Sequence, residues 1–146
     1  MEQQQPLDFV FYFAAPLEKV WDGFVSRESN RIIFGGADLA IELKPGGTIA
    51  WVGPGPDGKR IPYVHGTILR AEPPKLLQYT FAMGQNDKPS RVTLELVPES
   101  EAIKVIVRHD EWAKEDATRA DCADGWPRIL SRLKTLVETG KTFKPH

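Results

Sequence analysis

The chain has 146 residues, of which 41% are hydrophobic and 27% are charged, and its formal net charge is −1. This length and composition predict one soluble domain, residues 1–146, which buries roughly 70% of the surface of the unfolded chain. Because no basic stripe with interleaved aromatic residues is present, nucleic acid is excluded as an expected partner.

The sequence gives no sign of a membrane or secretory location. No apolar run approaches the ~20 residues of a membrane span. Residues 1–6 lack the basic and apolar regions of a signal peptide. The single cysteine, Cys122, allows no intrachain disulfide and fits a reducing compartment, so we expect a cytoplasmic protein.

The first predicted element is a strand at residues 7–14, which places Phe9, Phe11 and Phe13 on one face. Pro16 then opens a predicted helix, because proline is tolerated in a first helical turn. A second short helical turn is expected at residues 27–33. The apolar stripe of the first helix consists of Leu17, Val20, Trp21, Phe24 and Val25.

The middle of the chain is a series of strand-like segments separated by turns rich in proline, glycine and charged residues. A polar loop is expected at residues 84–89. Because most connections are short, the six strands should be antiparallel neighbours in one sheet. These predicted strands are residues 39–43, 48–52, 61–71, 76–83, 92–96 and 103–109.

A long amphipathic helix is predicted from about residue 116 to residue 139. Its apolar positions keep one 3.6-residue phase across Pro127, so we expect a single helix that is kinked near this proline. Gly140 is placed to cap its C-terminus. Because no other element can cover the apolar face of the sheet, this helix should lie across it and enclose an apolar space.

Several short motifs occur in an order that resembles the START-like superfamily, also called SRPBCC, and within it the branch named for the activator of Hsp90 ATPase homologue. The resemblance covers roughly residues 8–140. The motifs are Ala15-Pro16 with Val20-Trp21, Pro45-Gly46-Gly47, Gly66-Thr67-Ile68 before Pro73-Pro74, Leu77-Gln78-Tyr79-Thr80-Phe81, Val107-Arg108-His109, and Gly125-Trp126-Pro127-Arg128-Ile129-Leu130.

The resemblance implies an α+β helix-grip fold, also described as Bet v 1-like or START-like. In this fold a seven-stranded antiparallel sheet curves around a long C-terminal helix, and two short helices follow the first strand. A deep pocket between sheet and helix accepts an apolar ligand in many relatives. Relatives include lipid carriers, hormone and polyketide binders, cyclases and a co-chaperone domain, so the fold alone does not decide the function.

Large apolar side chains are the candidates for lining such a pocket. The alternative for each of them is ordinary core packing, which is the more common role of large aromatic residues. Trp126 is expected to be buried on the inner side of the last helix. The candidates are Phe13, Trp21, Phe24, Trp51, Tyr79, Phe81, Trp112, Trp126 and Leu130.

The polar candidates are His65, His109 and Tyr79. His109 continues the inward face of Val105 and Val107, so it should point toward the helix. The face of His65 is not assigned by the pattern, because Ile68, on the other side of its strand, looks more like core. A histidine in a pocket can act as an acid or base near neutral pH, and the alternative is a histidine held in the core or rim by one hydrogen bond.

Three functions remain open. The leading hypothesis is binding of an apolar or aromatic small molecule in the pocket. The second is an enzyme of the cyclase or hydrolase type, which needs His109 or His65 to converge with Tyr79 on an open cavity. The third is a chaperone-interaction module like the Hsp90 activator. No metal ligands stand at the usual spacing, so neither a metal nor another cofactor is expected.

Overall fold

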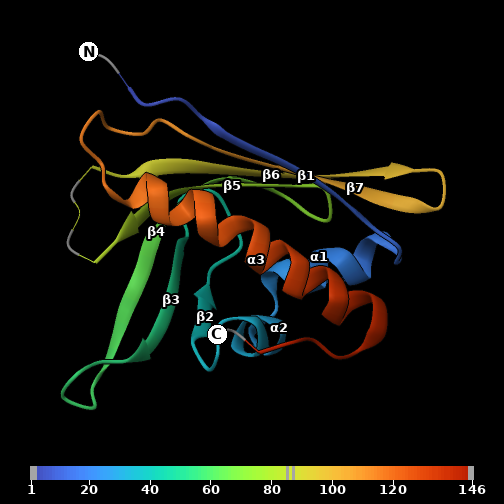
Figure 1. Ribbon diagram of the computed structural model, residues 1–146, viewed down its shortest axis with the longest axis horizontal. Helices are drawn as coiled ribbons and strands as arrows, with labels where there is room; N and C mark the ends of the chain where they lie inside the picture. The colour runs from blue at the N-terminus through green and yellow to red at the C-terminus, as the bar shows by residue number, and fades with distance from the viewer. Residues whose placement is uncertain (1–2, 85, 87, 145–146) are drawn as a thin grey trace.

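The computed structural model describes residues 3–84, 86 and 88–144 and shows a curved antiparallel sheet with a long helix across its concave face (Figure 1). The strands are β1 (Leu7–Phe13), β2 (Asp38–Ile41), β3 (Thr48–Pro54), β4 (Arg60–Glu72), β5 (Leu76–Met83), β6 (Ser90–Glu99) and β7 (Ala102–Asp110). The helices are α1 (Leu17–Val25), α2 (Arg27–Ile33) and α3 (Thr118–Thr139). The predicted α+β helix-grip architecture is therefore confirmed.

The sheet has seven strands in the order β1-β7-β6-β5-β4-β3-β2. The six strands from β2 to β7 are antiparallel neighbours in chain order, as the short turns predict. The first strand joins the last, with Leu7 opposite His109 and Phe13 opposite Ile103. Irregular pairing within β3–β4 and within β4–β5 bends the sheet, because an extra residue in one strand increases the local twist.

The two short helices share one residue at their junction. Ser26 caps the end of α1, where its backbone N–H donates to the backbone carbonyl of Asp22. It also caps the start of α2, where its hydroxyl accepts from the backbone N–H of Ser29 at 3.2 Å. Gly23 allows α1 to approach α3 closely. A Cβ atom at this position would lie only 2.8 Å from Cγ2 of Val137, so any larger residue would force the helices apart.

The long helix α3 continues through Pro127, as its apolar phase predicts, and a kink at this residue stays a prediction. It begins at Thr118, two residues later than expected, because the Asp116 carboxylate accepts from the backbone N–H and hydroxyl of Thr118 at 3.0 and 2.6 Å. It ends at Thr139 and is capped by Gly140, whose φ of 86° only glycine adopts freely. No helix among the described residues is long and apolar enough to cross a bilayer.

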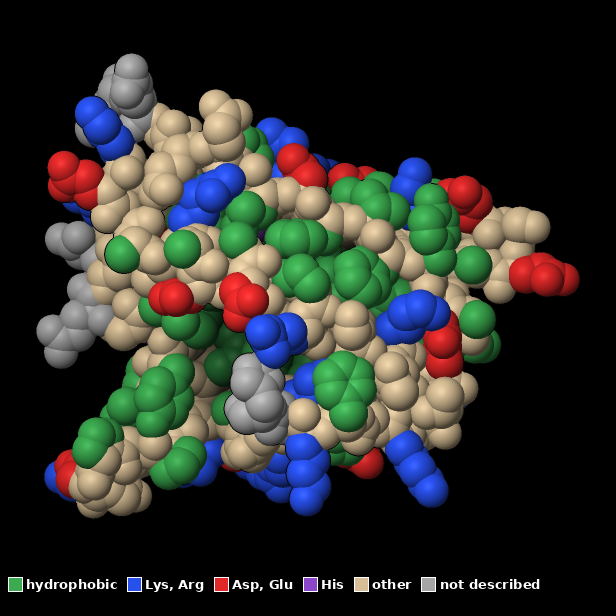
Figure 2. Space-filling view, in the orientation of Figure 1, with side chains coloured by type: hydrophobic (Ala, Val, Ile, Leu, Met, Phe, Trp, Pro, Cys, Tyr) green, Lys and Arg blue, Asp and Glu red, His purple; other side chains and the backbone are tan. Residues whose placement is uncertain are grey.

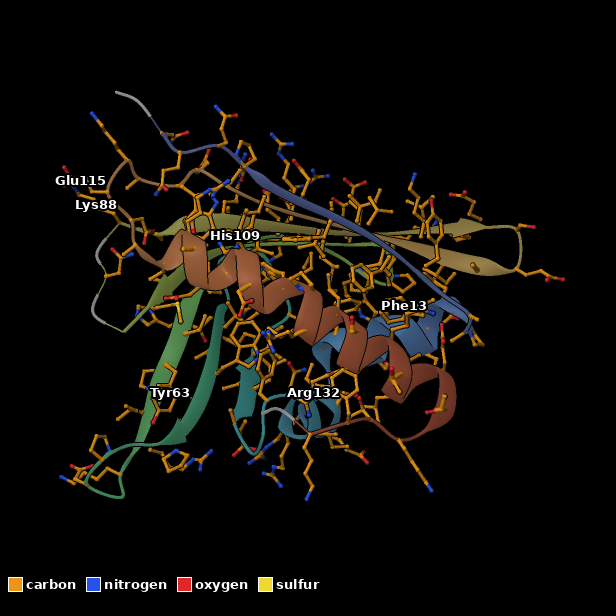
Figure 3. All side chains as sticks on the ribbon, viewed as in Figure 1. Phe13, Tyr63, Lys88, His109, Glu115 and Arg132 are labelled. Atoms are coloured by element: carbon orange, nitrogen blue, oxygen red, sulfur yellow. The ribbon has the colours of Figure 1, made fainter. Side chains whose placement is uncertain are left out.

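A buried arginine fixes α3 to α2. The Arg132 side chain donates to the backbone carbonyls of Ile32, Ile33 and Phe143, the first at 2.9 Å and the last at 2.7 Å. The first two carbonyls belong to the end of α2, where carbonyl groups lack partners within the helix and carry partial negative charge. Arg132 therefore closes α2 and ties it to α3 (Figure 3).

The boundaries of several strands differ from the prediction. Strand β6 extends beyond the predicted 92–96, and β3 continues through Pro54 into the expected glycine- and proline-rich loop. Pairing with neighbouring strands accounts for this, since residues without strong β preference are included where a partner strand satisfies their backbone groups. Residues 85 and 87 of the predicted loop at 84–89 lie outside the described residues.

Candidate functional site

An apolar cavity of about 370 Å³ lies between the N-terminal half of α3 and strands β3, β4 and β5. Figure 2 shows hydrophobic side chains in the hollow beside α3. A smaller space of about 40 Å³ extends from it deeper into the core. The larger cavity is lined by Phe34, Ala37, Trp51, Tyr63, Val64, Tyr79, Phe81, Met83, Asp121, Cys122, Gly125, Trp126 and Ile129.

A bulge in β4 borders the outer, open side of this cavity. Trp51 pairs with Val64, and Val52 pairs with Pro62, so Tyr63 is the extra residue of β4. The Tyr63 hydroxyl donates to the backbone carbonyl of Pro54. The bulge increases the bend of the β3–β4 hairpin, on which Tyr63 stands apart from α3 (Figure 3). The cavity is therefore open on this side.

The Trp51 ring forms the inner wall and is held in place by Asn30. The indole N–H of Trp51 donates to Oδ1 of Asn30 at 2.9 Å. The Asn30 amide in turn donates to the backbone carbonyls of Phe24 and Ser26 at 3.0 and 2.7 Å. Because Asn30 is buried and fully used, it fixes one orientation of the indole. Sequence reasoning missed Asn30, since one asparagine in a short helix gives no distinguishing pattern.

His109 is fully buried behind the cavity, as its inward position predicts. The Trp126 indole N–H donates to Nδ1 of His109 at 3.0 Å, so the neutral ring carries its proton on Nε2. Nε2 donates to the Ser90 hydroxyl at 2.7 Å, and this hydroxyl donates to the Phe81 carbonyl at 3.3 Å. The His109 ring also contacts Trp112, with centroids 4.0 Å apart. Both of its nitrogens are therefore occupied.

Burial lowers the pKa of His109 to about 3, although the carboxylates of Asp110 and Asp116 oppose this shift. The imidazole is therefore neutral at physiological pH, because desolvation penalises the charged form more than these carboxylates favour it. With both nitrogens bonded inside the protein, His109 has no free position from which to exchange a proton with a ligand. It serves as a fixed support for Trp126.

His65 lies on the other face of the sheet. It pairs with Ala50 in β3 and Ala82 in β5. The neighbours of these alanines, Trp51 and Phe81, face the cavity, so strand alternation directs His65 away from it. Its Nε2 is 2.9 Å from the backbone carbonyl of Gly84. The prediction that His65 lines the pocket is therefore wrong, and His65 does not converge with Tyr79 on the cavity as the proton-transfer hypothesis would require.

The structure divides the other predicted pocket residues into two groups. Phe24, Trp51, Tyr79, Phe81 and Trp126 border the cavity or its inner extension. Trp126 is half-buried rather than buried, since one side of its ring faces the cavity. The residues that do not border it are Phe13, Trp21 and Leu130 in the main core and His109 and Trp112 in the cluster behind the cavity.

The position of each residue along α3 determines whether it borders the cavity. Phe13 lies at the opposite end of α3 from His109 (Figure 3). At that end α1 fills the space between the sheet and the helix, so Phe13 and Trp21 become core residues. Leu130 is fully buried and packs in the same core.

The cavity wall carries two weakly polar groups, the Tyr79 phenol and the Cys122 thiol. Burial raises the pKa of Tyr79, with a smaller contribution from Cys122. Burial also raises the pKa of Cys122 to about 12, assisted by Asp116 and Asp121. Both groups are therefore protonated at neutral pH. The Tyr79 hydroxyl bonds to no described residue, so it is available to a ligand.

The described residues contain no cluster of three or more His, Cys, Asp or Glu side chains that could hold a metal ion. His109, the most central titratable group near the cavity, already uses both nitrogens inside the protein. The polar chemistry that the described residues offer at this site is thus limited to hydrogen bonding by a phenol and a thiol, and to the carboxylate of Asp121.

A curved antiparallel sheet closed by a long C-terminal helix, with an apolar cavity between them, defines a helix-grip protein. Residues 14–138 match the family described as activator of Hsp90 ATPase homolog 1-like protein. The chain therefore belongs to this family, which confirms the family that the sequence motifs predict. Comparison with curated proteins found no match.

Solved structures share this fold. ChR145 from Cytophaga hutchinsonii is 26% identical, with a TM-score of 0.77 over 96% of this chain and 98% of that one. The Aha1 dimer from Colwellia psychrerythraea is 17% identical, with a TM-score of 0.75 over 94% and 99%. An Hsp90 activator from Plasmodium falciparum is 15% identical, with a TM-score of 0.75 over 92% and 96%.

Proposed function

We propose that the protein binds an apolar or aromatic small molecule in the cavity between α3 and strands β3–β5. The observation that carries this proposal is the cavity itself, whose volume of about 370 Å³ lies in the range of roughly 300–1,000 Å³ that is typical of ligand sites. Its walls are mainly aromatic, and the Tyr79 hydroxyl offers one hydrogen bond to orient a ligand.

The polar groups near the cavity favour binding over catalysis. The indole N–H groups of Trp51 and Trp126 already have partners inside the protein. Tyr79 and Cys122 are protonated, and His109 is neutral with both nitrogens bonded. General acid–base catalysis needs a group whose pKa lies near the working pH. None of Tyr79, Cys122 and His109 supplies such a group, so the site is suited to holding a molecule unchanged.

A neutral fluorescent probe, N-phenyl-1-naphthylamine, tests the proposal, because its emission increases in an apolar environment. Saturable binding to the purified protein is expected. Gly125 provides the blocking variant, since it lines the cavity and a Cβ atom at this position would meet no atom within 4 Å. Gly125→Leu should place its side chain in the open space and reduce probe affinity at least about tenfold, since a filled pocket loses its buried contact area.

Gly125→Ala is the matched control. It adds only a methyl group and should retain probe binding, while stabilising α3 by up to about 1 kcal/mol because alanine is a better helix former than glycine. Thermal unfolding of both variants verifies that they fold. No saturable binding by the wild-type protein, or equal binding by Gly125→Leu, would contradict the proposal.

Interaction with a chaperone is the second candidate, and family membership favours it, since the family carries the name of an Hsp90 activator. A row across the outer face of the sheet joins Tyr12, Lys104 and Val97, and the two apolar members are 48% and 38% exposed. A cytoplasmic location, which the free Cys122 favours, would bring the protein into contact with such a chaperone. Stimulation of Hsp90 ATP hydrolysis by the wild-type chain, lost in Tyr12→Ser, is the expected result, and no stimulation would contradict it.

A further inference from the structure

The cavity is rich in aromatic rings and carries one charge. Among the described residues that line it, six are aromatic, and Asp121 alone is charged. Asp121 stands in the first turn of α3 with its side chain exposed. No ion pair or hydrogen bond joins its carboxylate to another described residue. The first turn favours an acid through the helix dipole, but the dipole does not require this acid to border a cavity.

Two basic residues flank Asp121 on α3, and both have other partners. Arg119, two residues before Asp121, donates from Nε to the backbone carbonyl of Gln5 at 2.7 Å, and residues two apart on a helix do not face each other. Arg128 lies about two turns after Asp121, and its Nε is 3.2 Å from Oδ2 of Asp124. This pair contributes little net charge to its surroundings, because the two opposite charges largely cancel at a distance. It does not compensate Asp121.

A second basic group is also paired with an acid. Arg31 and Arg60 bind the Asp38 carboxylate at 2.5 and 2.7 Å. Asp38 precedes Leu39, which pairs with Trp51, a residue of the cavity wall. The Asp38 carboxylate offsets the charge of these arginines, and neither Asp38 nor the two arginines are among the described residues that line the cavity.

We infer that the cavity selects its ligand by charge: it accepts a neutral or cationic aromatic molecule, such as an aromatic amine, and rejects aromatic carboxylates and other anions. This rests on the proposed function, since it names the class of ligand for the same cavity. An anion would leave water for a site where no lining cation replaces its hydration. It would also be repelled by the Asp121 carboxylate at the rim.

A cation gains from the same features. The electron-rich faces of Trp51, Tyr79 and Trp126 attract an ammonium group that lies within about 6 Å of a ring centroid. The Asp121 carboxylate provides an ion pair at the rim. Negative potential from this carboxylate extends to the cavity wall, since Asp116 and Asp121 both contribute to the raised pKa of the Cys122 thiol.

Three probes with one ring system test this inference by isothermal titration calorimetry at neutral pH. They are 1-naphthylmethylammonium, 1-naphthylmethanol and 1-naphthylacetate, which differ mainly in charge. The cation should bind about tenfold or more tightly than the anion, with the neutral alcohol between them. Asp121→Asn should reduce this ratio severalfold, because the amide keeps the shape and removes the charge.

Glu18→Gln is the control, because Glu18 is an exposed acid in the first turn of α1, at the other end of the molecule (Figure 1). It makes the same change in net charge and should leave the ratio as in the wild type. Equal affinity for cation and anion, or an unchanged ratio in Asp121→Asn, would overturn the inference while binding of the alcohol still supports the proposed function. Failure of all three probes to bind would overturn both.

Discussion

The two halves of α3 meet the sheet in opposite ways. Residues 130–139, the packed half, bury Leu130, Leu133 and Val137 in the main core. Residues 118–129, the cavity half, place Trp126 and Ile129 along an open space. One continuous helix therefore supports a closed core at one end and an apolar cavity at the other. The comparison teaches that close packing and an open cavity can be divided between the two halves of a single element.

The short helices account for this difference. Helices α1 and α2 fill the packed end, where Gly23 allows close contact with Val137 and Arg132 binds the end of α2. Among the described residues, no helix other than α3 lies at the other end, where the bulge at Tyr63 turns the β3–β4 hairpin away from α3. Mutations in the packed half should therefore reduce stability, and mutations in the cavity half should mainly change binding.

Two adjacent residues on α3, Leu130 and Ile129, should show the largest difference in the effect of mutation on stability. Leu130→Ala should lower the free energy of unfolding by about 4 kcal/mol, because it leaves a new void in a fully packed core. Ile129→Ala should cost only about 1 kcal/mol, since this half-buried side chain already borders open space. Urea-induced unfolding measures both values. Equal losses would show that the two halves are packed alike.

Removal of the Arg132 side chain should have the next largest effect. Arg132→Met keeps much of the apolar stem but leaves buried carbonyls at the end of α2 without donors, so a loss of about 3 kcal/mol is expected. Probe affinity should change little, because Arg132 does not border the cavity. Arg70→Met is the control, since the exposed pair of Arg70 with Glu72 should contribute less than about 1 kcal/mol. A similar loss in both variants would contradict this role.

The cavity half should be the acid-sensitive part of the molecule through His109. Its folded-state pKa of about 3 lies below the usual value of 6.5, so the unfolded state binds more protons between these values. Stability from this residue is therefore complete above the unfolded pKa and is lost as the pH falls. Between about pH 7 and pH 5 the wild type should lose about 2 kcal/mol from this residue alone.

His109→Gln removes this titration and should flatten the decrease over the same range, although its stability at neutral pH will be lower. His65→Gln should keep the wild-type pH dependence, because His65 lies on the other face of the sheet. Chemical denaturation at a series of pH values measures both. An unchanged slope in His109→Gln would show that another group is responsible.

The sequence predicts the elements better than it predicts the cavity. Periodicity specifies which face of a strand or helix is apolar, so the inward position of His109 and the continuity of α3 across Pro127 follow from spacing alone. Periodicity does not specify how closely the neighbouring elements pack against that face. For this reason Phe13 and Leu130, which share the inward face with true cavity residues, lie in the packed core instead.

The contacts that fix the cavity walls could not be predicted, because their partners are distant in the chain. Asn30 orients Trp51 across 21 positions, and Arg132 binds carbonyls about 100 positions away. Neither contact has a signature in local composition. The bulge at Tyr63 is likewise set by pairing between strands, and the alternation of β4 alone gives no indication of which residue is extra.

The pairing of β1 with β7 has a consequence for synthesis on the ribosome. Strand β1, which contains Leu7, cannot pair until β7, which contains His109, has been synthesised. The helix α3, which covers the concave face of the sheet, is synthesised after β7. Until α3 has emerged, only α1 and α2 are available to cover the inward side chains of a nearly complete sheet. The apolar inward face of the sheet is therefore exposed on the nascent chain until α3 is synthesised, and the cavity is the final part of the molecule to form.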